Sequence, residues 1–251
     1  MNRFRDLLVA CLVLVLFFAP AIYPATGQTG TIVGTVRLGG KMPGQDAIAV
    51  TKDPEICGKS KPGTRLIVGA NQGVANSVVY LQGPLKGKSW VKADYIMDQQ
   101  KCVYVPHILV VPAGTEMNFT NADPVLHNIH AYDLSTTDTL FNIALPIKGM
   151  KIKKPLSKPG IYLLTCDAGH PWMNGYLFVA ENPYVSITDG DGNFRLTDVP
   201  AGNYKLTFWH EGIATAQGTT NMPEKPYTDT KDVVLQPGKE LRMDFTLTQR
   251  Q

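Results

Sequence analysis

The stretch that decides the fold runs from Gly160 to Tyr176 and reads G-I-Y-L-L-T-C-D-A-G-H-P-W-M-N-G-Y. It begins with a short apolar run at 161–165, which follows a Pro-Gly turn signal and is typical of a buried strand. A second run at 176–180 predicts another strand directly afterwards. The turn between the two predicted strands carries three side chains with metal-binding donor atoms: Cys166, His170 and Met173.

These three side chains offer a thiolate, an imidazole and a thioether. Together with a second imidazole they form the ligand set of copper sites in which two His and one Cys lie in a trigonal plane and a Met binds weakly along the axis. The missing imidazole is available upstream at His127, in the segment D-P-V-L-H-N. The sequence therefore predicts one copper ion held by these four residues. The alternative is structural: a buried Cys and a core Met beside an incidental surface His.

The order of these residues resembles the cupredoxins, the blue-copper electron-transfer family of plastocyanin and azurin. In that family one His, usually followed by Asn, comes from a mid-domain loop, while the Cys, the second His and the Met come from the loop joining the last two strands. His127-Asn128, Cys166, His170 and Met173 fall on those positions in that order. The resemblance covers roughly residues 66–181. It implies a Greek-key β-sandwich, one type 1 copper ion and single-electron transfer without enzymatic activity.

The resemblance also implies roles for neighbouring residues. The backbone N–H of Asn128 is expected to donate to the sulfur of Cys166. His170 is expected to reach the surface as the electron port, with Pro171 and Trp172 in the face that docks a partner; core packing is an equally weighted alternative for Trp172.

A binuclear centre is the first alternative to a single ion. The spacing C-x₃-H-x₂-M also resembles the tail of the binuclear copper loop of cytochrome oxidase, but that centre needs a second Cys where Tyr162 stands. We therefore expect a mononuclear site.

Three other His are weaker ligand candidates. Strand alternation would point His130 away from the face of His127, and His107 would join the site only if its strand passes it. His210 falls in the second predicted domain, where it either contacts the copper domain or lies on the surface.

The first 27 residues have the pattern of a secretory signal peptide. Arg3 and Arg5 precede an apolar run at 7–19, and small residues follow. The run is short for a bilayer span, so we expect cleavage near Gly27 and no membrane span afterwards, with an uncleaved anchor as the alternative. A lipoprotein anchor at Cys11 is less favoured, because the apolar run continues past it. Export predicts a periplasmic or extracellular location, where conditions are oxidising.

Removal of the signal leaves three cysteines, Cys57, Cys102 and Cys166. An odd number in an exported protein indicates a thiol with a separate role. Because the resemblance assigns Cys166 to the metal, we expect a disulfide between Cys57 and Cys102. Two separate reduced thiols are the alternative, which an oxidising compartment disfavours.

The charge of the chain excludes some partner classes. The formal net charge is +3 and about +2 without the signal, too small to predict binding to nucleic acid or an anionic membrane. A local group of lysines is best explained by a solvated edge strand or hairpin; a docking patch for an acidic redox partner is the alternative. These are Lys148, Lys151, Lys153, Lys154 and Lys158. The expected partner is an exported redox protein such as a c-type cytochrome or a dehydrogenase.

The sequence changes character near Asn182-Pro183. T-D-G-D-G-N-F-R-L at 188–196 and V-P-A-G-N-Y-K-L at 199–206 resemble the carboxypeptidase-regulatory-like, or transthyretin-like, β-sandwich. Members of that group are small non-catalytic modules. The Asp-Gly pair predicts a tight hairpin turn, and a calcium loop is disfavoured because no bidentate Glu follows at the required position.

We therefore predict an all-β chain with a signal peptide at 1–27, a cupredoxin-like domain at 28–182 and a smaller β-sandwich at 183–251. Residues 30–36, G-T-I-V-G-T-V, also resemble the first strand of the small module. The copper domain either precedes this module or is inserted into it. Two other functions stay open: an open-site copper enzyme or sensor, in which His130 or solvent replaces Met173, and a metal-free cell-surface binding or assembly module.

Overall fold

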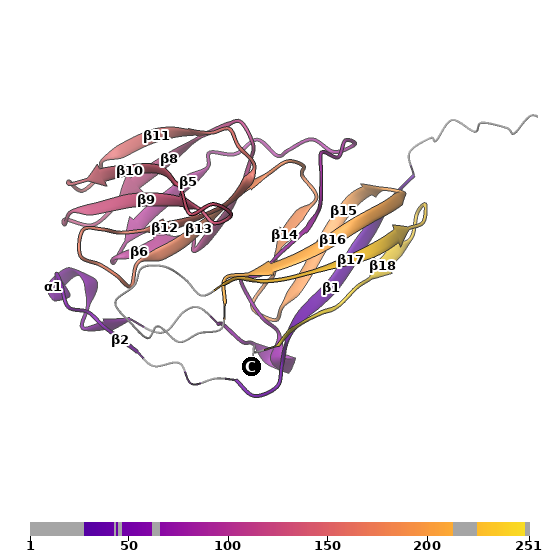
Figure 1. Cartoon of the computed structure of the whole chain (residues 1–251), viewed down its shortest axis with the longest axis horizontal. Coiled ribbons are helices and arrows are strands. Elements are labelled where there is room, and N and C mark those ends of the chain that lie inside the picture. The colour runs from indigo at the N-terminus through magenta and orange to yellow at the C-terminus, as the bar shows by residue number, and fades with distance from the viewer. Residues whose placement is uncertain (1–27, 43, 45–46, 62–65, 213–224, 249–251) are drawn as a thin grey trace, which may run out of the picture.

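The structure is a computed structural model that describes residues 28–42, 44, 47–61, 66–212 and 225–248. The predicted signal peptide lies outside these residues. Within the described ranges, no helix is long and apolar enough to cross a membrane. These ranges are almost entirely strands and loops, with a short helix α1 (Pro54–Cys57) and a 3₁₀ turn η1 (Ala70–Gln72) (Figure 1). The prediction of an all-β chain is confirmed.

The first sandwich is formed by residues 96–180 (Figure 1). Its larger sheet has the strand order β10-β9-β12-β13-β7. In chain order these are β7 (Ile108–Pro112), β9 (His127–Asp133), β10 (Thr139–Leu145), β12 (Gly160–Thr165) and β13 (Asn174–Ala180). Its smaller sheet has the order β11-β8-β5-β6. In chain order these are β5 (Ile96–Gln100), β6 (Val103–Val105), β8 (Thr115–Asn121) and β11 (Lys151–Leu156).

Strand alternation decides which side chains of β9 face the core of this sandwich. His127, Ile129 and Ala131 point inward and are fully buried, whereas His130 and Tyr132 lie on the other face and are partly exposed. Successive side chains of a strand point to opposite faces. His127 is therefore directed toward the interior by the same register that buries the apolar residues around it.

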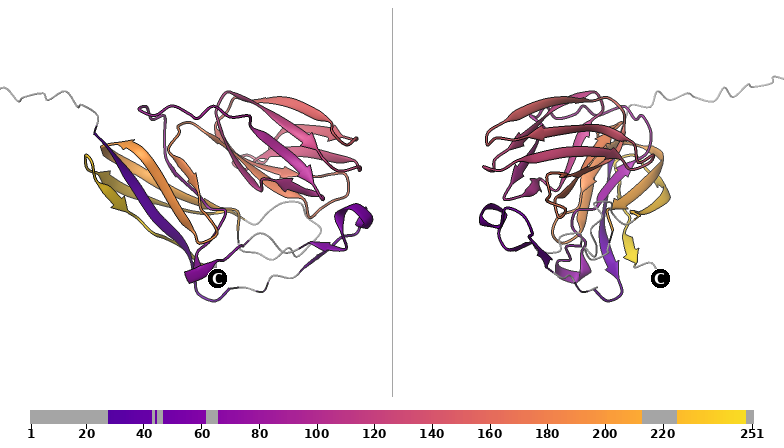
Figure 2. Two further views of the ribbon diagram at one scale, coloured as in Figure 1. Left: turned by 180° about the vertical axis from the view of Figure 1, so that it is seen from behind. Right: turned by 60° about the vertical axis from the view of Figure 1, so that its left-hand side comes forward.

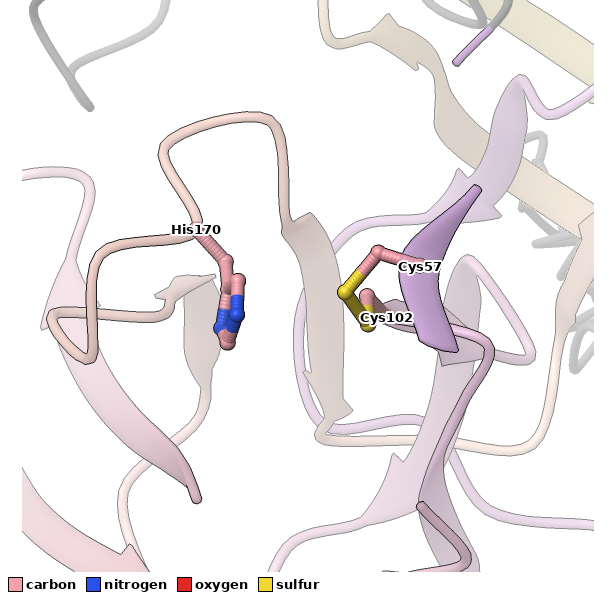
Figure 3. A group of neighbouring side chains, drawn as sticks. All are labelled: Cys57, Cys102 and His170. Atoms are coloured by element: carbon pink, nitrogen blue, oxygen red, sulfur yellow. A yellow bond between two sulfur atoms is a disulfide. The ribbon is translucent and has the colours of Figure 1, made fainter. Parts of the chain in front are cut away.

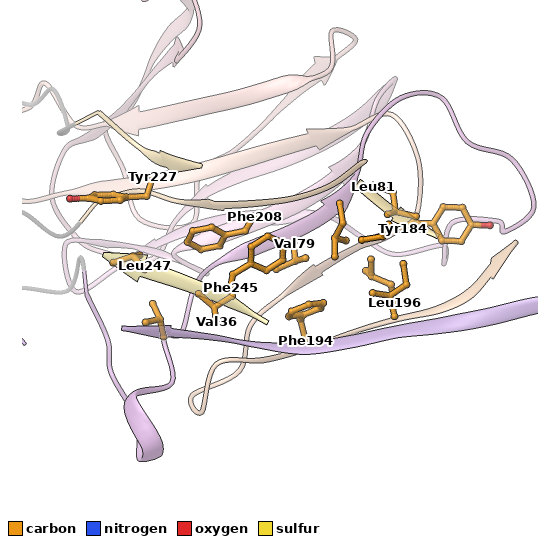
Figure 4. Packing of buried hydrophobic residues seen from close by; sticks show 14 of the residues in the cluster. Val36, Val79, Leu81, Tyr184, Phe194, Leu196, Phe208, Tyr227, Phe245 and Leu247 are labelled. Carbon is orange, nitrogen blue, oxygen red and sulfur yellow. The ribbon is translucent and has the colours of Figure 1, made fainter. Parts of the chain in front are cut away.

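The second sandwich also has two sheets, packed around the aromatic and aliphatic core shown in Figure 4. One contains β1 (Thr29–Gly39), β15 (Asn193–Pro200), β18 (Glu240–Arg242) and β19 (Phe245–Thr248). The other has the order β14-β4-β16-β17. In chain order these are β4 (Val78–Leu81), β14 (Val185–Ile187), β16 (Gly202–His210) and β17 (Tyr227–Leu235). A separate pair, β2 (Ile48–Ala49) and β3 (Ser60–Lys61), flanks α1.

Strand pairing shows how the two sandwiches are connected. β1 runs antiparallel to β15 and parallel to β18 and β19, and β4 pairs with both β14 and β16. Residues 29–39 and 78–81 are therefore strands of the second sandwich, although the predicted boundary grouped them with the first. The chain leaves the second sandwich after β4 and returns to it at β14, which is the inserted arrangement (Figure 2).

The sandwiches meet through an apolar cluster. Val78 and Trp209 of the second sandwich pack with Tyr176 and Phe178 of the first. The ring centroids of Tyr176 and Trp209 are 5.2 Å apart. This contact joins the outer face of the β13 sheet to the outer face of the β16 sheet.

A buried polar group lies at the same junction. His210 and Glu211 are at most 1 % exposed, and an oxygen of Glu211 is hydrogen-bonded to Nε2 of His107, which belongs to the first sandwich. The sequence left open whether His210 contacts the copper domain or lies on the surface; it is buried beside this contact. Burial lowers the pKa of His210 to about 4.

The lysine group follows an edge of the first sandwich. β11 is the outermost strand of the smaller sheet, and Lys151, Lys153 and Lys154 occupy it. Lys153 pairs with Glu116 at 3.4 Å, and Lys158 pairs with Asp133 at 2.8 Å. Two of these five lysines therefore have local counter-charges.

The buried imidazole predicts acid sensitivity. Because the pKa of His210 is lower in the folded chain than the value of about 6.5 expected when unfolded, the unfolded state binds more protons as the pH falls from about 6.5 toward 4. The free energy of unfolding should fall in that window, by at most about 1.4 kcal/mol per pH unit from this residue. Denaturant unfolding at pH 7 and pH 5 should show a smaller loss for His210→Phe than for the unsubstituted protein. An equal loss would place the acid sensitivity elsewhere.

Candidate metal centre

Two neighbouring strands bring the candidate ligands together. His127 is the first residue of β9, and Cys166 and His170 lie in the loop that joins β12 to β13. β9 and β12 are antiparallel partners, with His130 opposite Thr165. The loop after β12 therefore begins beside the start of β9. As expected, the backbone N–H of Asn128 donates to the sulfur of Cys166, at 3.5 Å.

Three donor atoms converge. The Nδ1 atoms of His127 and His170 are 3.3 Å apart, and the sulfur of Cys166 lies 3.9 Å from the first and 3.6 Å from the second. Bonds of about 2.0 Å to nitrogen and about 2.3 Å to sulfur, as for Zn²⁺, separated by about 120° would place the nitrogens about 3.5 Å apart and each about 3.7 Å from the sulfur. The three residues are at most 1 % exposed. Their spacing fits one trigonally bound ion in a site closed to solvent.

Two other groups of close donor atoms in the described residues do not form metal sites. One joins His170 to Cys57 and Cys102, and the other joins Cys102 to Asp123 and His127. Cys57 and Cys102 form a disulfide, as predicted, and Cys166 is a free cysteine. Thiolates are the metal ligands, and a disulfide provides none. Figure 3 shows the disulfide beside the imidazole of His170.

Each imidazole has a carboxylate on its outer nitrogen. Nε2 of His127 lies 2.9 Å from Oδ2 of Asp123, and Nε2 of His170 lies 2.9 Å from Oδ2 of Asp53. A carboxylate accepts hydrogen bonds, so in the neutral form of both rings Nε2 is the nitrogen that carries the proton and Nδ1 has the lone pair. These lone pairs are on the nitrogens that face each other and the sulfur. The carboxylates thus set the tautomer that a metal ion requires.

The surroundings also affect the protonation of the ligands. Burial raises the pKa of Cys166, although the N–H groups of Asn128 and Ala168 act in the opposite direction. Burial lowers the pKa of His170, against the effect of its hydrogen bond to Asp53. A neutral imidazole is ready to bind metal, whereas the thiol must lose its proton when metal binds.

The fourth predicted ligand lies in the same buried cluster. Met173 is 1 % exposed and packs in the core that contains Cys166. Its backbone N–H donates to the carbonyl of His170 at 2.9 Å, which closes the loop into a turn. This turn holds the thioether, the imidazole and the thiol on one short segment.

The expected surface position of His170 is wrong. The residue is 0 % exposed, because the segment containing Asp53 covers it. Nζ of Lys52 reinforces this cover by donating to the carbonyl of Ala168 at 2.5 Å.

Only one of the two residues predicted for the docking face lies on the surface. Pro171 is exposed, but Trp172 is only 6 % exposed and its Nε1 donates to the carbonyl of Cys102 at 3.1 Å. Its ring centroid lies 5.3 Å from that of His170. Trp172 therefore packs in the core between the metal-site loop and the disulfide, which is the alternative that the sequence left open.

The other histidines stay outside the centre. His130 bonds Asp167 through Nδ1 at 2.7 Å and Thr139 through Nε2 at 2.8 Å, and His107 contacts Glu211. Among the described residues, neither belongs to a group of three donors close enough to hold an ion.

Sequence reasoning missed both carboxylates. Asp123 had a local signal, because it precedes His127 by four residues in the quoted segment D-P-V-L-H-N. Asp53 is 117 residues from His170, and no local pattern connects them.

A known family model matches the C-terminal part of the chain. Residues 179–248 match the family model described as a carboxypeptidase regulatory-like domain. This range contains β14 to β19 and includes both motifs that suggested such a module. A search of curated proteins finds no match to the chain.

Several solved cupredoxin structures are similar to part of the chain. A novel purple cupredoxin from Nitrosopumilus maritimus is 26% identical over 35% of this chain and 100% of its own, with a TM-score of 0.31. A Cu-containing nitrite reductase from Thermus scotoductus SA-01 is 22% identical over 40% of this chain and 26% of its own, with a TM-score of 0.33. A reduced Cu(I) amicyanin variant is 19% identical over 41% of this chain and 98% of its own, with a TM-score of 0.32.

The disulfide is expected to stabilise the fold. Its cysteines are 45 residues apart in sequence, so removing the link frees a long loop in the unfolded chain. Replacing both, as Cys57→Ala with Cys102→Ala, should lower the free energy of unfolding by about 2–5 kcal/mol in denaturant titrations. Thiol titration of the denatured, signal-free protein should find one free thiol before substitution. Three free thiols, or unchanged stability in the double variant, would contradict this expectation.

Proposed function

We propose that this chain is an exported mononuclear type 1 copper protein that carries single electrons between redox partners. The observation that carries the proposal is the convergence of one free thiol and two Nδ1 atoms at trigonal distances in a buried pocket. A thiolate with two imidazoles is the ligand set of blue-copper sites, and we propose Met173, which is buried in the same cluster, as the weak axial ligand.

When bound, copper supplies a one-electron couple. The chain supplies a rigid frame, because its ligands come from the start of β9 and from one tight loop between two core strands. In their neutral form His127 and His170 direct their Nδ1 lone pairs at the site, and the N–H of Asn128 holds the sulfur of Cys166 in position. Such a frame limits rearrangement of the ligands between the two oxidation states.

Burial favours a carrier over an open-site enzyme or sensor. The three donor residues are at most 1 % exposed, so a substrate has no direct approach to the ion. Electrons can pass through a thin layer of protein, whereas substrate atoms cannot. We therefore propose no enzymatic activity.

The proposed setting is the periplasm or the extracellular space. The Cys57–Cys102 disulfide supports this location, because disulfides persist in oxidising compartments. The proposed partner is an exported redox protein such as a c-type cytochrome or a dehydrogenase.

The ligand set predicts a visible signature. Purified protein loaded with one equivalent of Cu(II) should show an intense thiolate-to-copper charge-transfer band, and Cys166→Ser should lose it completely because the band requires the thiolate. His130→Ala should keep the band, since His130 lies on the other face of β9. Persistence of the band in Cys166→Ser would refute the ligand assignment. Large copper hyperfine splitting in the electron paramagnetic spectrum would favour the open-site alternative, and failure to take up copper would favour the binding module.

A further inference from the structure

The two carboxylates on the outer nitrogens are held by many contacts of their own. Asp123 is buried, and its two oxygens accept the backbone N–H groups of Lys101 and Cys102, each at 2.7 Å. Its own N–H donates to Oδ1 of Asn121 at 2.9 Å. The carboxylate therefore has one orientation, and that orientation directs Oδ2 at His127.

Asp53 is fixed by its backbone. It has φ 51° and ψ 44°, the left-handed conformation that Asp adopts more readily than most residues. Its carbonyl accepts the N–H groups of Ile56 and Cys57 at 3.0 and 2.8 Å. The side chain thus projects from the start of α1 toward the metal-site loop, and it is 26 % exposed.

One covalent bond connects the two supports. Cys57 ends α1, the helix that begins after Asp53, and Cys102 donates its N–H to Asp123. The Cys57–Cys102 disulfide therefore joins the segment that carries one carboxylate to the turn that orients the other. Figure 3 shows this disulfide beside His170. The segment that the disulfide attaches is the one that covers His170.

A carboxylate in this position changes the metal preference of its imidazole. It accepts the Nε2–H bond, which makes Nδ1 a stronger donor, and it places a negative charge near the ion. Solvent screens this charge less for the buried Asp123 than for the partly exposed Asp53. Both effects favour the more highly charged ion, so Cu(II) gains more than Cu(I).

We propose that Asp53 and Asp123 are positioning residues that lower the reduction potential of the copper centre and hold both imidazoles in their ligating tautomer. This inference rests on the proposed function. It assigns a role to the α1 segment, which would otherwise only cover the site. The inference rests on the pair of carboxylate–imidazole contacts. Their two carboxylates come from distant segments that one disulfide joins.

The decisive variant is Asp53→Asn, with Glu55→Gln as the matched control. Asn keeps an oxygen that can accept the Nε2–H bond of His170 but removes the charge. Glu55 lies on the same helix and is exposed, so its substitution removes an equal charge. In the copper-loaded, disulfide-bonded protein, Asp53→Asn should lower the Cu(II)-to-Cu(I) affinity ratio about tenfold, raising the midpoint potential by about 59 mV for this one-electron couple. Glu55→Gln should shift it much less.

A second variant and a metal-free measurement keep the inference testable if one protein misfolds. Asp123→Asn should raise the potential in the same direction. In the copper-free, unsubstituted protein, ¹⁵N NMR of the imidazoles should find the proton on Nε2 of both His127 and His170. Equal potentials in Asp53→Asn and Glu55→Gln, or protons on Nδ1, would overturn the inference while a wild-type charge-transfer band still upheld the copper site. Absence of that band in the wild type would instead refute the proposed function.

Discussion

The antiparallel pairing of β9 with β12 is the constraint on which the candidate metal centre depends. It places the first residue of β9 beside the loop that follows β12, so that one candidate ligand is positioned by a strand and two by a turn. The N–H of Asn128 then reaches the sulfur of Cys166. A shift of one residue in this register would turn His127 out of the core, because strand side chains alternate.

The disulfide provides the second constraint. The segment from Lys52 to Cys57 covers the site on the side of His170, through Asp53 and Lys52. A short segment with one turn of helix has little stability alone. Its attachment to Cys102 fixes it to the same turn that orients Asp123, so a single link organises two sides of the pocket.

The sequence predicted the features that are encoded locally. Cys166 and His170 lie on one loop, and the apolar runs around them predicted β12 and β13. The bond from the Asn128 N–H to the Cys166 sulfur was expected from the resemblance of His127-Asn128 to the cupredoxin pattern. The burial of His170 was not predictable, because the covering Asp53 is far away in sequence and carries no motif that links it to the loop.

The strand at 30–36 is an intermediate case. Its composition resembled the small module, but only pairing with β15, β18 and β19 places it there. Hydrophobic alternation identifies a strand and not its partner, since any sheet with a free edge satisfies the same pattern.

The insertion of one sandwich into the other has a mechanical consequence. The segment with β2, α1 and β3 reaches the first sandwich on its own excursion from the second. The connections that carry the inserted sandwich leave after β4 and return before β14, and these two strands are hydrogen-bonded neighbours, with Val185 opposite Tyr80. Two connections at one place resist twisting of one sandwich against the other in a way that a single linker does not. The same geometry suggests how the inserted unit could be removed by protein engineering: β4 and β14 are antiparallel, so a short reverse turn would close them into a hairpin. Cys57 would then need replacing as well, because its disulfide partner Cys102 leaves with the inserted unit.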